Sequence, residues 1–320
     1  MKIILLLILL FLIINTAKAE NNLIKQSVWA WEVNSKVRKI YILGELHQFS
    51  IENDSTIQIS HDLGGKIYDI SDQTWIETRQ TLPVKSVTAQ KLSNQLTPET
   101  WEKVKNGFKQ ATDSMIHWEL HERDSLLKQY VDNLDQQDPF NAFANLSRFA
   151  NAGKNNRRIN IKTIQGLNNT LSIHEKTSRN FKLKQIENTQ SIANAWWQNC
   201  NDKNKAEVLI TEALKWQNKD YNFSNDSDVI TQFIFLKDEN NADIFNSDFV
   251  NTTSSDKIIS ECVLTPRTKN WMPRIIEALY TEGPPITYLV GISHVGGEQG
   301  ILALLKKEGF TSIKRIHTIE

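Results

Sequence analysis

The chain carries one short pattern twice, near its two ends. Residues 39–47 read Lys-Ile-Tyr-Ile-Leu-Gly-Glu-Leu-His, and residues 286–294 read Ile-Thr-Tyr-Leu-Val-Gly-Ile-Ser-His. Each is an apolar run that ends in a glycine, with a histidine three residues later. Such a run is typical of a buried strand followed by a turn. Because α/β proteins place ligand groups on the loops after strand ends, we expect His47 and His294 to meet at one edge of a sheet.

A carboxylate follows a third short β-prone segment. Residues 74–77 read Thr-Trp-Ile-Glu, and the position of Glu77 matches a further strand end. Two neutral imidazoles and a carboxylate form a ligand set for a divalent metal that keeps open positions for water. Water bound to such a metal becomes acidic enough to attack a carbonyl near neutral pH. Glu77 is a candidate metal ligand or general base, and the competing interpretation is that His47 and His294 are structural.

The remaining pattern predicts a mixed α/β (α+β) fold. Residues 27–31 and 39–43 alternate as strands around a turn, which is typical of a hairpin. The segment Thr97-Pro98-Glu99-Thr100 carries the signals of a helix start. We therefore expect a central mixed sheet with both Gly-x-x-His motifs at strand ends, and a long, mainly helical insertion at about 95–260 between its two halves. The pattern also predicts helices at 181–197, 205–216, 271–280 and 300–308 and a strand at 310–319.

The N-terminal segment has the composition of a secretory signal peptide. A charged start is followed by an apolar run at 3–14, and Ala17 and Ala19 are the small residues that a signal peptidase reads. No other stretch approaches the roughly 20 apolar residues of a membrane helix. We therefore expect a cleaved signal peptide at 1–19, a single domain at 20–320, a periplasmic or secreted location, and no stable membrane insertion.

The charge balance of the mature chain argues against binding to nucleic acid. Cleavage removes Lys2 and Lys18, which leaves 37 − 2 = 35 basic residues against 37 acidic ones. The resulting formal charge, 35 − 37 = −2, offers no basic surface to nucleic acid or to anionic lipid.

The chain contains two cysteines, Cys200 and Cys262. In an oxidising exported compartment an even pair predicts a disulfide. The alternative is two reduced, buried thiols.

The chain resembles the TraB/GumN family, which includes the Tiki metalloproteases and the pheromone-shutdown proteins. The resemblance spans nearly all of the mature chain, and the order of its short motifs supplies the specificity. The matching residues are the first Gly-x-x-His strand at 41–47, Trp75-Ile76-Glu77, the segment 92–101, Arg267 with Trp271-Met272-Pro273, and the segment 288–310.

The resemblance implies a mixed α/β fold with both histidines and a glutamate in one cleft. For the Tiki branch it implies a peptidase that depends on Mn or Co, and Zn is the alternative metal. Carried over by position, His47 and His294 are metal-site residues and Glu77 is the essential carboxylate. Arg267 is carried over as a polar group near the cleft that binds substrate.

Three positions depart from the family pattern. Glu45 stands where the family usually has a small Thr or Ser, which adds a negative charge beside the predicted site. Asn168 lies where many members have Glu, and Thr268 follows Arg267 where Asn is usual.

Two functions are compatible with these observations. The first is an exported metal-dependent hydrolase, a metallopeptidase in which His47, His294 and Glu77 are the catalytic and metal-binding residues. Its expected partner is a polypeptide or small-molecule substrate. The second is a non-catalytic binding protein of the cell envelope with the same fold, which holds a metal, haem or a polypeptide. The sequence indicates no oligomeric state.

Overall fold

The computed structural model describes ten segments of the chain. The predicted signal peptide at 1–19 and His47 lie outside these segments. The described residues are 24–26, 28–45, 48–52, 58–77, 90–113, 120–146, 161–178, 182–188, 195–215 and 254–319.

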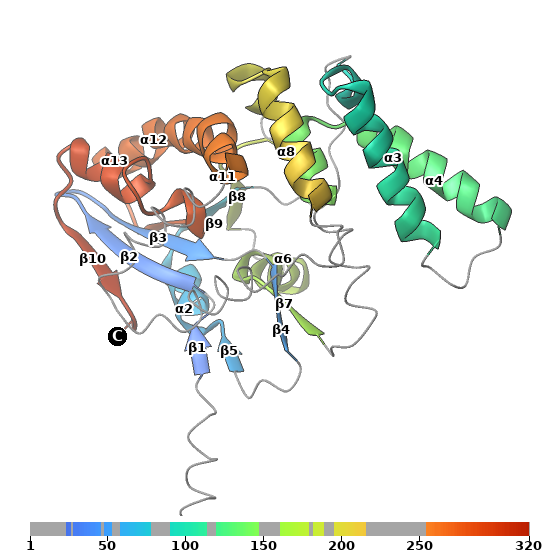
Figure 1. Ribbon diagram of the computed structural model, residues 1–320. Helices are drawn as coiled ribbons and strands as arrows, with labels where there is room; N and C mark the ends of the chain where they lie inside the picture. The colour runs from blue at the N-terminus through green and yellow to red at the C-terminus, as the bar shows by residue number, and fades with distance from the viewer. Residues whose placement is uncertain are drawn as a thin grey trace, which may run out of the picture.

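A six-stranded mixed sheet lies between helices on its two faces (Figure 1). Its strand order is β10-β2-β3-β9-β6-β8, in which β10, β2 and β3 pair antiparallel and β3, β9, β6 and β8 pair parallel. The antiparallel pairing of β2 with β3 confirms the predicted hairpin. The strands are β2 (Val28–Asn34), β3 (Lys39–Glu45), β6 (Gln73–Ile76), β8 (Leu183–Gln185), β9 (Ile286–Gly291) and β10 (Ile313–Ile316).

The strands of the two Gly-x-x-His motifs are neighbours in this sheet. In the parallel pair of β3 and β9, Gly44 lies opposite Val290 and Glu45 lies opposite Gly291. A Cβ atom on Gly44 would overlap the side chain of Ile292, so this glycine lets the turn after β9 pack against β3. His47 lies outside the described residues, and the meeting of the two imidazoles stays a prediction.

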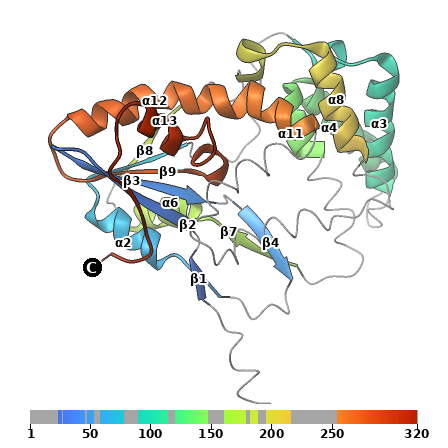
Figure 2. The ribbon, with the colours of Figure 1, turned by 60° about the vertical axis from the view of Figure 1, so that its left-hand side comes forward.

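Helices cover both faces of the sheet, which explains why its strands are apolar on both sides. Successive residues of a strand point to opposite faces, so Ile40 and Ile42 pack in one core and Tyr41 and Leu43 in another. The first core lies under α12 (Thr265–Tyr280) and α13 (Ile301–Lys307), and the second lies against α2 (Asp62–Ile70) and α6 (Leu167–Ser178). Figures 1 and 2 show α12 and α13 on one side of the sheet and α2 on the other.

Most of the remaining described helices form a region beyond one end of the sheet (Figures 1 and 2). It has its own core, which contains Trp196, Leu209 and Cys262. At the start of α3 the backbone N–H of Thr100 donates to the hydroxyl of Thr97 over 3.2 Å, as the sequence predicts for this helix start. The region comprises α3 (Pro98–Asp113), α4 (Leu120–Asp135), the helical residues 139–146 and 195–199, α8 (Lys203–Lys215) and α11 (Ser254–Ile259), which continues into the π-helical segment η3 (Ser260–Leu264).

Strands interrupt the segment that was expected to be mainly helical. The short strand β7 (Ile161–Gln165) lies in this segment and pairs antiparallel with β4 (Gln48–Glu52). Outside the segment, β1 (Ile24–Gln26) pairs parallel with β5 (Gln58–Ser60).

Within the described part of the chain, no helix is both long enough and apolar enough to cross a bilayer.

The prediction of a helix at 181–197 is wrong for the first part of this range. Residues 183–185 are strand β8, and among the described residues of the range only 195–197 are helical. The backbone N–H of Thr74 donates to Lys182 O over 3.0 Å, and that of Ile186 donates to Ile76 O over 2.8 Å. This pairing with β6 buries Leu183 and Ile186. A partner more than a hundred residues away therefore overrides the local helical spacing.

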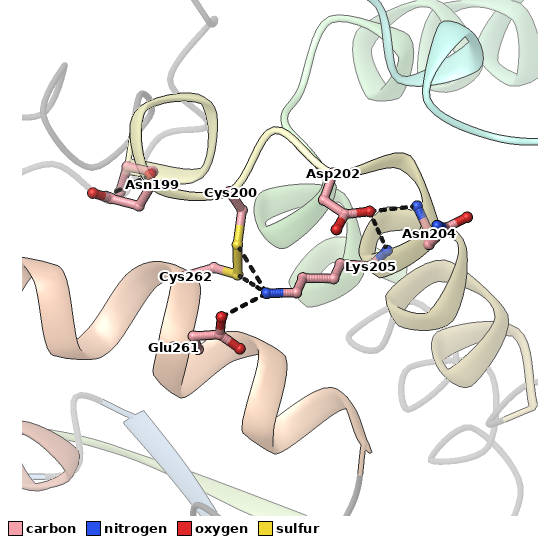
Figure 3. Close-up of a disulfide and its surroundings, with 8 residues drawn as sticks. Asn199, Cys200, Asp202, Asn204, Lys205, Glu261 and Cys262 are labelled. Carbon is pink, nitrogen blue, oxygen red and sulfur yellow. Dashed lines mark hydrogen bonds and ion pairs between the residues drawn. A yellow bond between two sulfur atoms is a disulfide. The ribbon is translucent and has the colours of Figure 1, made fainter.

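The predicted disulfide between Cys200 and Cys262 forms, with 5.4 Å between the two Cα atoms. It joins the turn before α8 to η3, directly ahead of α12 (Figure 3). The Lys205 ammonium lies 2.7 Å from a carboxylate oxygen of Glu261, and 3.8 and 4.0 Å from the two sulfur atoms. The bridge therefore ties the turn before α8 to the helical segment that continues into α12.

Candidate functional site

Four parallel strands place a polar side chain at the same edge of the sheet. Glu45 ends β3, Glu77 follows β6, Glu187 lies two residues after β8, and His294 lies three residues after β9. All four side chains are buried. Ligand sites of α/β sheets lie outside the carboxyl ends of their parallel strands. This edge is therefore the candidate site.

Helix α12 crosses the edge and contributes Arg267, Thr268 and Trp271. Positions 267 and 271 are four residues apart and share one face of the helix, and 268 lies beside them. All three side chains are buried. The Arg267 guanidinium also lies over the ring of Trp271, 5.2 Å from its centroid. The helix thus brings a fixed cation, a hydroxyl and an indole to the strand ends.

Arg267 links two carboxylates that are far apart in the sequence. One terminal nitrogen lies 2.9 Å from Oε2 of Glu77 and also contacts Oε1 of Glu187. Its Nε donates to the same Glu187 oxygen over 2.9 Å. Burial works to lower the pKa of Arg267, but the charges of Glu77 and Glu187 outweigh it and raise this pKa above its usual value. Arg267 is therefore a permanent cation here.

Glu187 accepts a third hydrogen bond, from the indole N–H of Trp271 over 3.2 Å. Burial raises the pKa of Glu187, and the Arg267 charge works against that rise. Glu77, Glu187, Arg267 and His294 form the described cluster. When His294 is neutral, the cluster holds two carboxylates and one guanidinium, so its formal charge is −2 + 1 = −1. A buried negative charge of this kind favours a bound cation or proton.

His294 is held on three sides. It lies in the 3₁₀ turn Ile292–His294 that follows β9. Its Nδ1 lies 2.7 Å from the hydroxyl of Thr268, and the ring of Trp271 packs against it at 4.4 Å between centroids. Its Nε2 lies 3.8 Å from Oε1 of Glu77, and this oxygen also accepts the backbone N–H of Gly291.

Glu45 belongs to the opposite face of the sheet. It has the strand parity of Tyr41 and Leu43, which pack on the α2 and α6 side, whereas Glu77 contacts α12. Oε2 of Glu45 accepts the backbone N–H of Asn168 over 3.0 Å, at the start of α6. Its charge is therefore stabilised by a helix N-terminus. Glu45 and Asn168, two of the three positions that depart from the family pattern, are therefore in direct contact with each other.

Nε2 of His294 and Oε1 of Glu77 are close enough together to bind one divalent metal ion. Two ligand atoms that each lie about 2.1 Å from one ion are at most about 4.2 Å apart, and the 3.8 Å between Nε2 of His294 and Oε1 of Glu77 falls within this limit. Among the described residues, no group of three or more His, Cys, Asp and Glu side chains could hold a metal. The third predicted ligand, His47, lies outside that part of the chain.

Sequence reasoning missed Glu187 altogether. The incorrect helix at 181–197 concealed that Glu187 follows a strand, as Glu77 does. The signal was present, because the short run of apolar and polar residues at 183–186 is followed directly by the carboxylate of Glu187. Thr268 was noted as a departure from the family pattern, but the sequence gave no indication of its contact with His294.

Comparison with known proteins agrees with the resemblance seen in the sequence. A model of the TraB/PrgY/gumN family matches residues 29–313, which is nearly the whole chain. No curated protein and no solved structure matches it. The matched span includes the candidate site at the sheet edge, with Glu77, Glu187, Arg267 and His294. The chain belongs to the TraB/PrgY/gumN family.

Proposed function

We propose that the protein is an exported metal-dependent hydrolase, a metallopeptidase in which His294, Glu77 and His47 hold a divalent metal. Mn or Co is the expected metal, with Zn as the alternative. One observation carries the proposal. Nε2 of His294 and Oε1 of Glu77 are 3.8 Å apart at the carboxyl edge of the sheet, in a described cluster whose formal charge is −1 when His294 is neutral.

The chain's own residues orient the proposed donors. Arg267 binds Oε2 of Glu77 and the Gly291 N–H binds Oε1, so the carboxylate is fixed with Oε1 toward His294. When bound, a divalent metal supplies a Lewis acid and an acidified water. Glu77 acts in this scheme either as a metal ligand or as the general base.

Arg267 has two proposed roles. The first is to bind substrate as a polar group near the cleft, as the family resemblance implies. The second is to position Glu77, which its pairing with Glu77 and Glu187 supports directly. An Arg267→Lys variant separates the two, since Lys keeps the charge but loses the planar donor fork. A positioning role predicts a fall in kcat, whereas a substrate-binding role predicts a rise in KM.

Metal binding tests the proposal first. The purified protein is dialysed against Mn, Co and Zn in turn, and bound metal is counted per chain. The wild type is expected to bind about one equivalent, and His294→Ala combined with His47→Ala to bind none. His174→Ala is a matched control, because His174 is exposed on α6. Stoichiometric metal retained by the double variant would refute the proposed ligand set.

Glu77→Gln assigns the role of the carboxylate. If the variant loses the metal, Glu77 is a ligand. If it keeps the metal and loses turnover, Glu77 is the general base. Glu207→Gln is the control, because Glu207 accepts hydrogen bonds from Thr97 and Thr100 in the helical region.

A peptide-library digest separates the hydrolase from the binding protein. Cleavage that a chelator stops and that Glu77→Gln abolishes supports a metallopeptidase. A protein that retains a metal, haem or polypeptide on purification and cleaves no peptide in the library would favour the alternative, a binding protein of the cell envelope.

Export is tested separately from catalysis. We propose that residues 1–19 are removed as a signal peptide and that the protein is periplasmic or secreted. The intact mass of the protein, produced with its own N-terminal segment, is expected to correspond to a chain that begins at Glu20. A retained segment at 1–19 would contradict export by this route.

A further inference from the structure

We infer that Thr268 is a positioning residue that fixes His294 in the tautomer protonated on Nδ1, so that Nε2 presents its electron pair toward Glu77. Leu264, Thr268 and His294 form a hydrogen-bonded triad in which Thr268 and His294 are buried. The assignment of the tautomer rests on the proposed function only for its consequence on metal affinity.

The direction in which the Thr268 hydroxyl donates its hydrogen determines the tautomer of His294. The Thr268 hydroxyl lies 2.9 Å from the backbone oxygen of Leu264 and 2.7 Å from Nδ1 of His294. A carbonyl oxygen only accepts, and a hydroxyl has a single hydrogen to donate. If that hydrogen goes to Leu264, the hydroxyl oxygen can only accept from the imidazole. Nδ1 of His294 must then carry the proton.

The packing keeps this arrangement in place. Thr268 is buried in the first turn of α12, where a threonine hydroxyl readily bonds the carbonyl four residues earlier. Leu264 is the last residue of the π-helical segment, and the neighbouring Cys262 is tied to Cys200 by the disulfide. On the other side, the ring of Trp271 packs against the imidazole at 4.4 Å. The imidazole therefore has little freedom to flip.

The consequence appears at the other ring nitrogen. With the proton on Nδ1, Nε2 carries a lone pair and faces Oε1 of Glu77 at 3.8 Å. Two electron-rich atoms at this distance repel each other unless a cation or proton lies near both. Metal-bound histidines usually donate their second ring N–H to a protein or water acceptor, which fixes the ring and raises its basicity. Thr268 supplies that acceptor here as a hydroxyl rather than a carboxylate.

The tautomer can be read directly from ¹⁵N shifts of the imidazole ring. We would record long-range ¹H–¹⁵N spectra of the mature protein after treatment with chelator, at roughly pH 8.5, about two units above the usual pKa of histidine. The His294 signals are those that disappear in His294→Gln. The wild type is expected to show a protonated Nδ1 and an unprotonated Nε2. Thr268→Ser should keep this pattern, and Thr268→Val should lose it.

Thr281→Val is the matched control. Thr281 is the C-cap residue that follows α12, and its hydroxyl makes the same kind of bond, to Glu277 O over 2.8 Å, but it is exposed. Its spectrum should match that of the wild type. A wild-type signal protonated on Nε2, or on both nitrogens, overturns the inference, and so does an unchanged pattern in Thr268→Val. If Thr268→Val does not fold, the wild-type spectrum decides alone.

The metal consequence is measured separately. Loss of such an orienting partner typically weakens metal binding by about 10- to 100-fold, and we expect Thr268→Val to weaken Mn binding to this extent and Thr268→Ser to restore it. A wild type that binds no metal would remove the proposed function but leave the tautomer result standing. A wild type that binds metal with its proton on Nε2 would remove the inference alone.

Discussion

Buried acidic groups occur both at the carboxyl edge of the sheet and in the helical region, and their partners differ. In the helical region Asp138 accepts the backbone N–H groups of Phe140 and Asn141, two and three residues later, over 2.9 and 3.1 Å. At the sheet edge Glu77 contacts Arg267 and His294, which lie 190 and 217 residues away.

The difference separates structural from functional burial of a carboxylate. Asp138 satisfies the free N–H groups at the start of the helical residues 139–146, which is the ordinary task of a capping residue. Glu77 and Glu187 instead flank the Arg267 guanidinium, and Glu77 also faces the imidazole of His294, groups that no helix end requires. Burial alone therefore does not indicate a site. Contact of a buried carboxylate with a cation and a histidine from distant parts of the chain does indicate a site.

The largest effect is expected from Arg267→Met. Removing one partner of a buried ion pair costs roughly 3–5 kcal/mol, and the loss of Arg267 leaves two carboxylates without their cation, so we expect a cost of about 5 kcal/mol in the free energy of unfolding. Urea unfolding at neutral pH measures it. Adding Glu187→Gln should recover part of the loss.

An exposed ion pair is the control for Arg267. Lys103 lies 2.6 Å from Glu99 on the surface of α3, and pairs of this kind contribute about 1 kcal/mol or less. Lys103→Met should therefore change the unfolding free energy little. Equal costs for the two variants would abolish the distinction drawn between the sheet edge and the helical region.

Removal of the disulfide should cost slightly less. The bridge joins cysteines 62 residues apart, and the chain-entropy model gives about 4 kcal/mol for a loop of this length. Cys200→Ala combined with Cys262→Ala, unfolded in urea beside the wild type, measures the loss. Hydrogen exchange should show α8 opening before the sheet, because the bridge anchors the helical region. Exchange that rises first in β3 and β9 would contradict this.

Asp138 should make stability depend on pH. Burial raises its pKa from 3.8 to about 6 although its hydrogen bonds work to lower it. A folded pKa above the unfolded one means that the native state binds the proton more tightly, so stability falls as pH rises between these values. The shift corresponds to a loss of about 3 kcal/mol in the free energy of unfolding. This loss is absent below about pH 4 and complete above about pH 6.

Asp138→Asn isolates this contribution, because the amide keeps an acceptor oxygen but does not ionise. Denaturant midpoints of the variant and the wild type are compared from about pH 4 to 7.5, a range that spans both pKa values of Asp138. The variant should gain stability relative to the wild type as pH rises. A constant difference across this range would show that the pKa of Asp138 is not raised.

The smallest effect is expected at the helix start of α3. The Thr97 hydroxyl accepts the Thr100 N–H over 3.2 Å and donates to Glu207 over 2.8 Å. Loss of such a cap costs about 1 kcal/mol, so Thr97→Ala should lower the unfolding free energy by about this amount. Thr177→Ala, at an exposed position within α6, should be neutral or stabilising. If Thr97→Ala left the unfolding free energy unchanged, a water molecule would be replacing the Thr97 hydroxyl as the acceptor of the Thr100 N–H.

Features with local causes were predictable from the sequence. The hairpin of β2 and β3, the cap at Thr97 and the end of the helix predicted at 300–308, which Gly309 follows, depend on residues close together in the chain. Gly309 has a φ of 89°, the left-handed conformation that glycine adopts readily at helix ends. The positions of Glu77 and His294 after strands were also predicted, because an apolar run before a polar residue is a local signal.

Features with distant causes were not predictable. Strand β8 exists through its hydrogen bonds to β6, so the segment 181–197 was assigned as a helix and Glu187 was overlooked. The face on which Glu45 lies followed from strand parity and the position of α6. The contact between Thr268 and His294 depends on how α12 crosses the sheet edge.

The sequence by itself determined the family, the hairpin, the start of α3, the helices α8, α12 and α13, and the strand-end positions of Glu77 and His294. Tertiary structure decided which groups meet there: Arg267 between two carboxylates, Thr268 on one imidazole nitrogen and Glu77 facing the other. The physical reason is that strand and helix signals act over a few residues, whereas sheet order and helix crossing are set by the burial of side chains from distant segments. Contacts between such segments have no local trace in the chain.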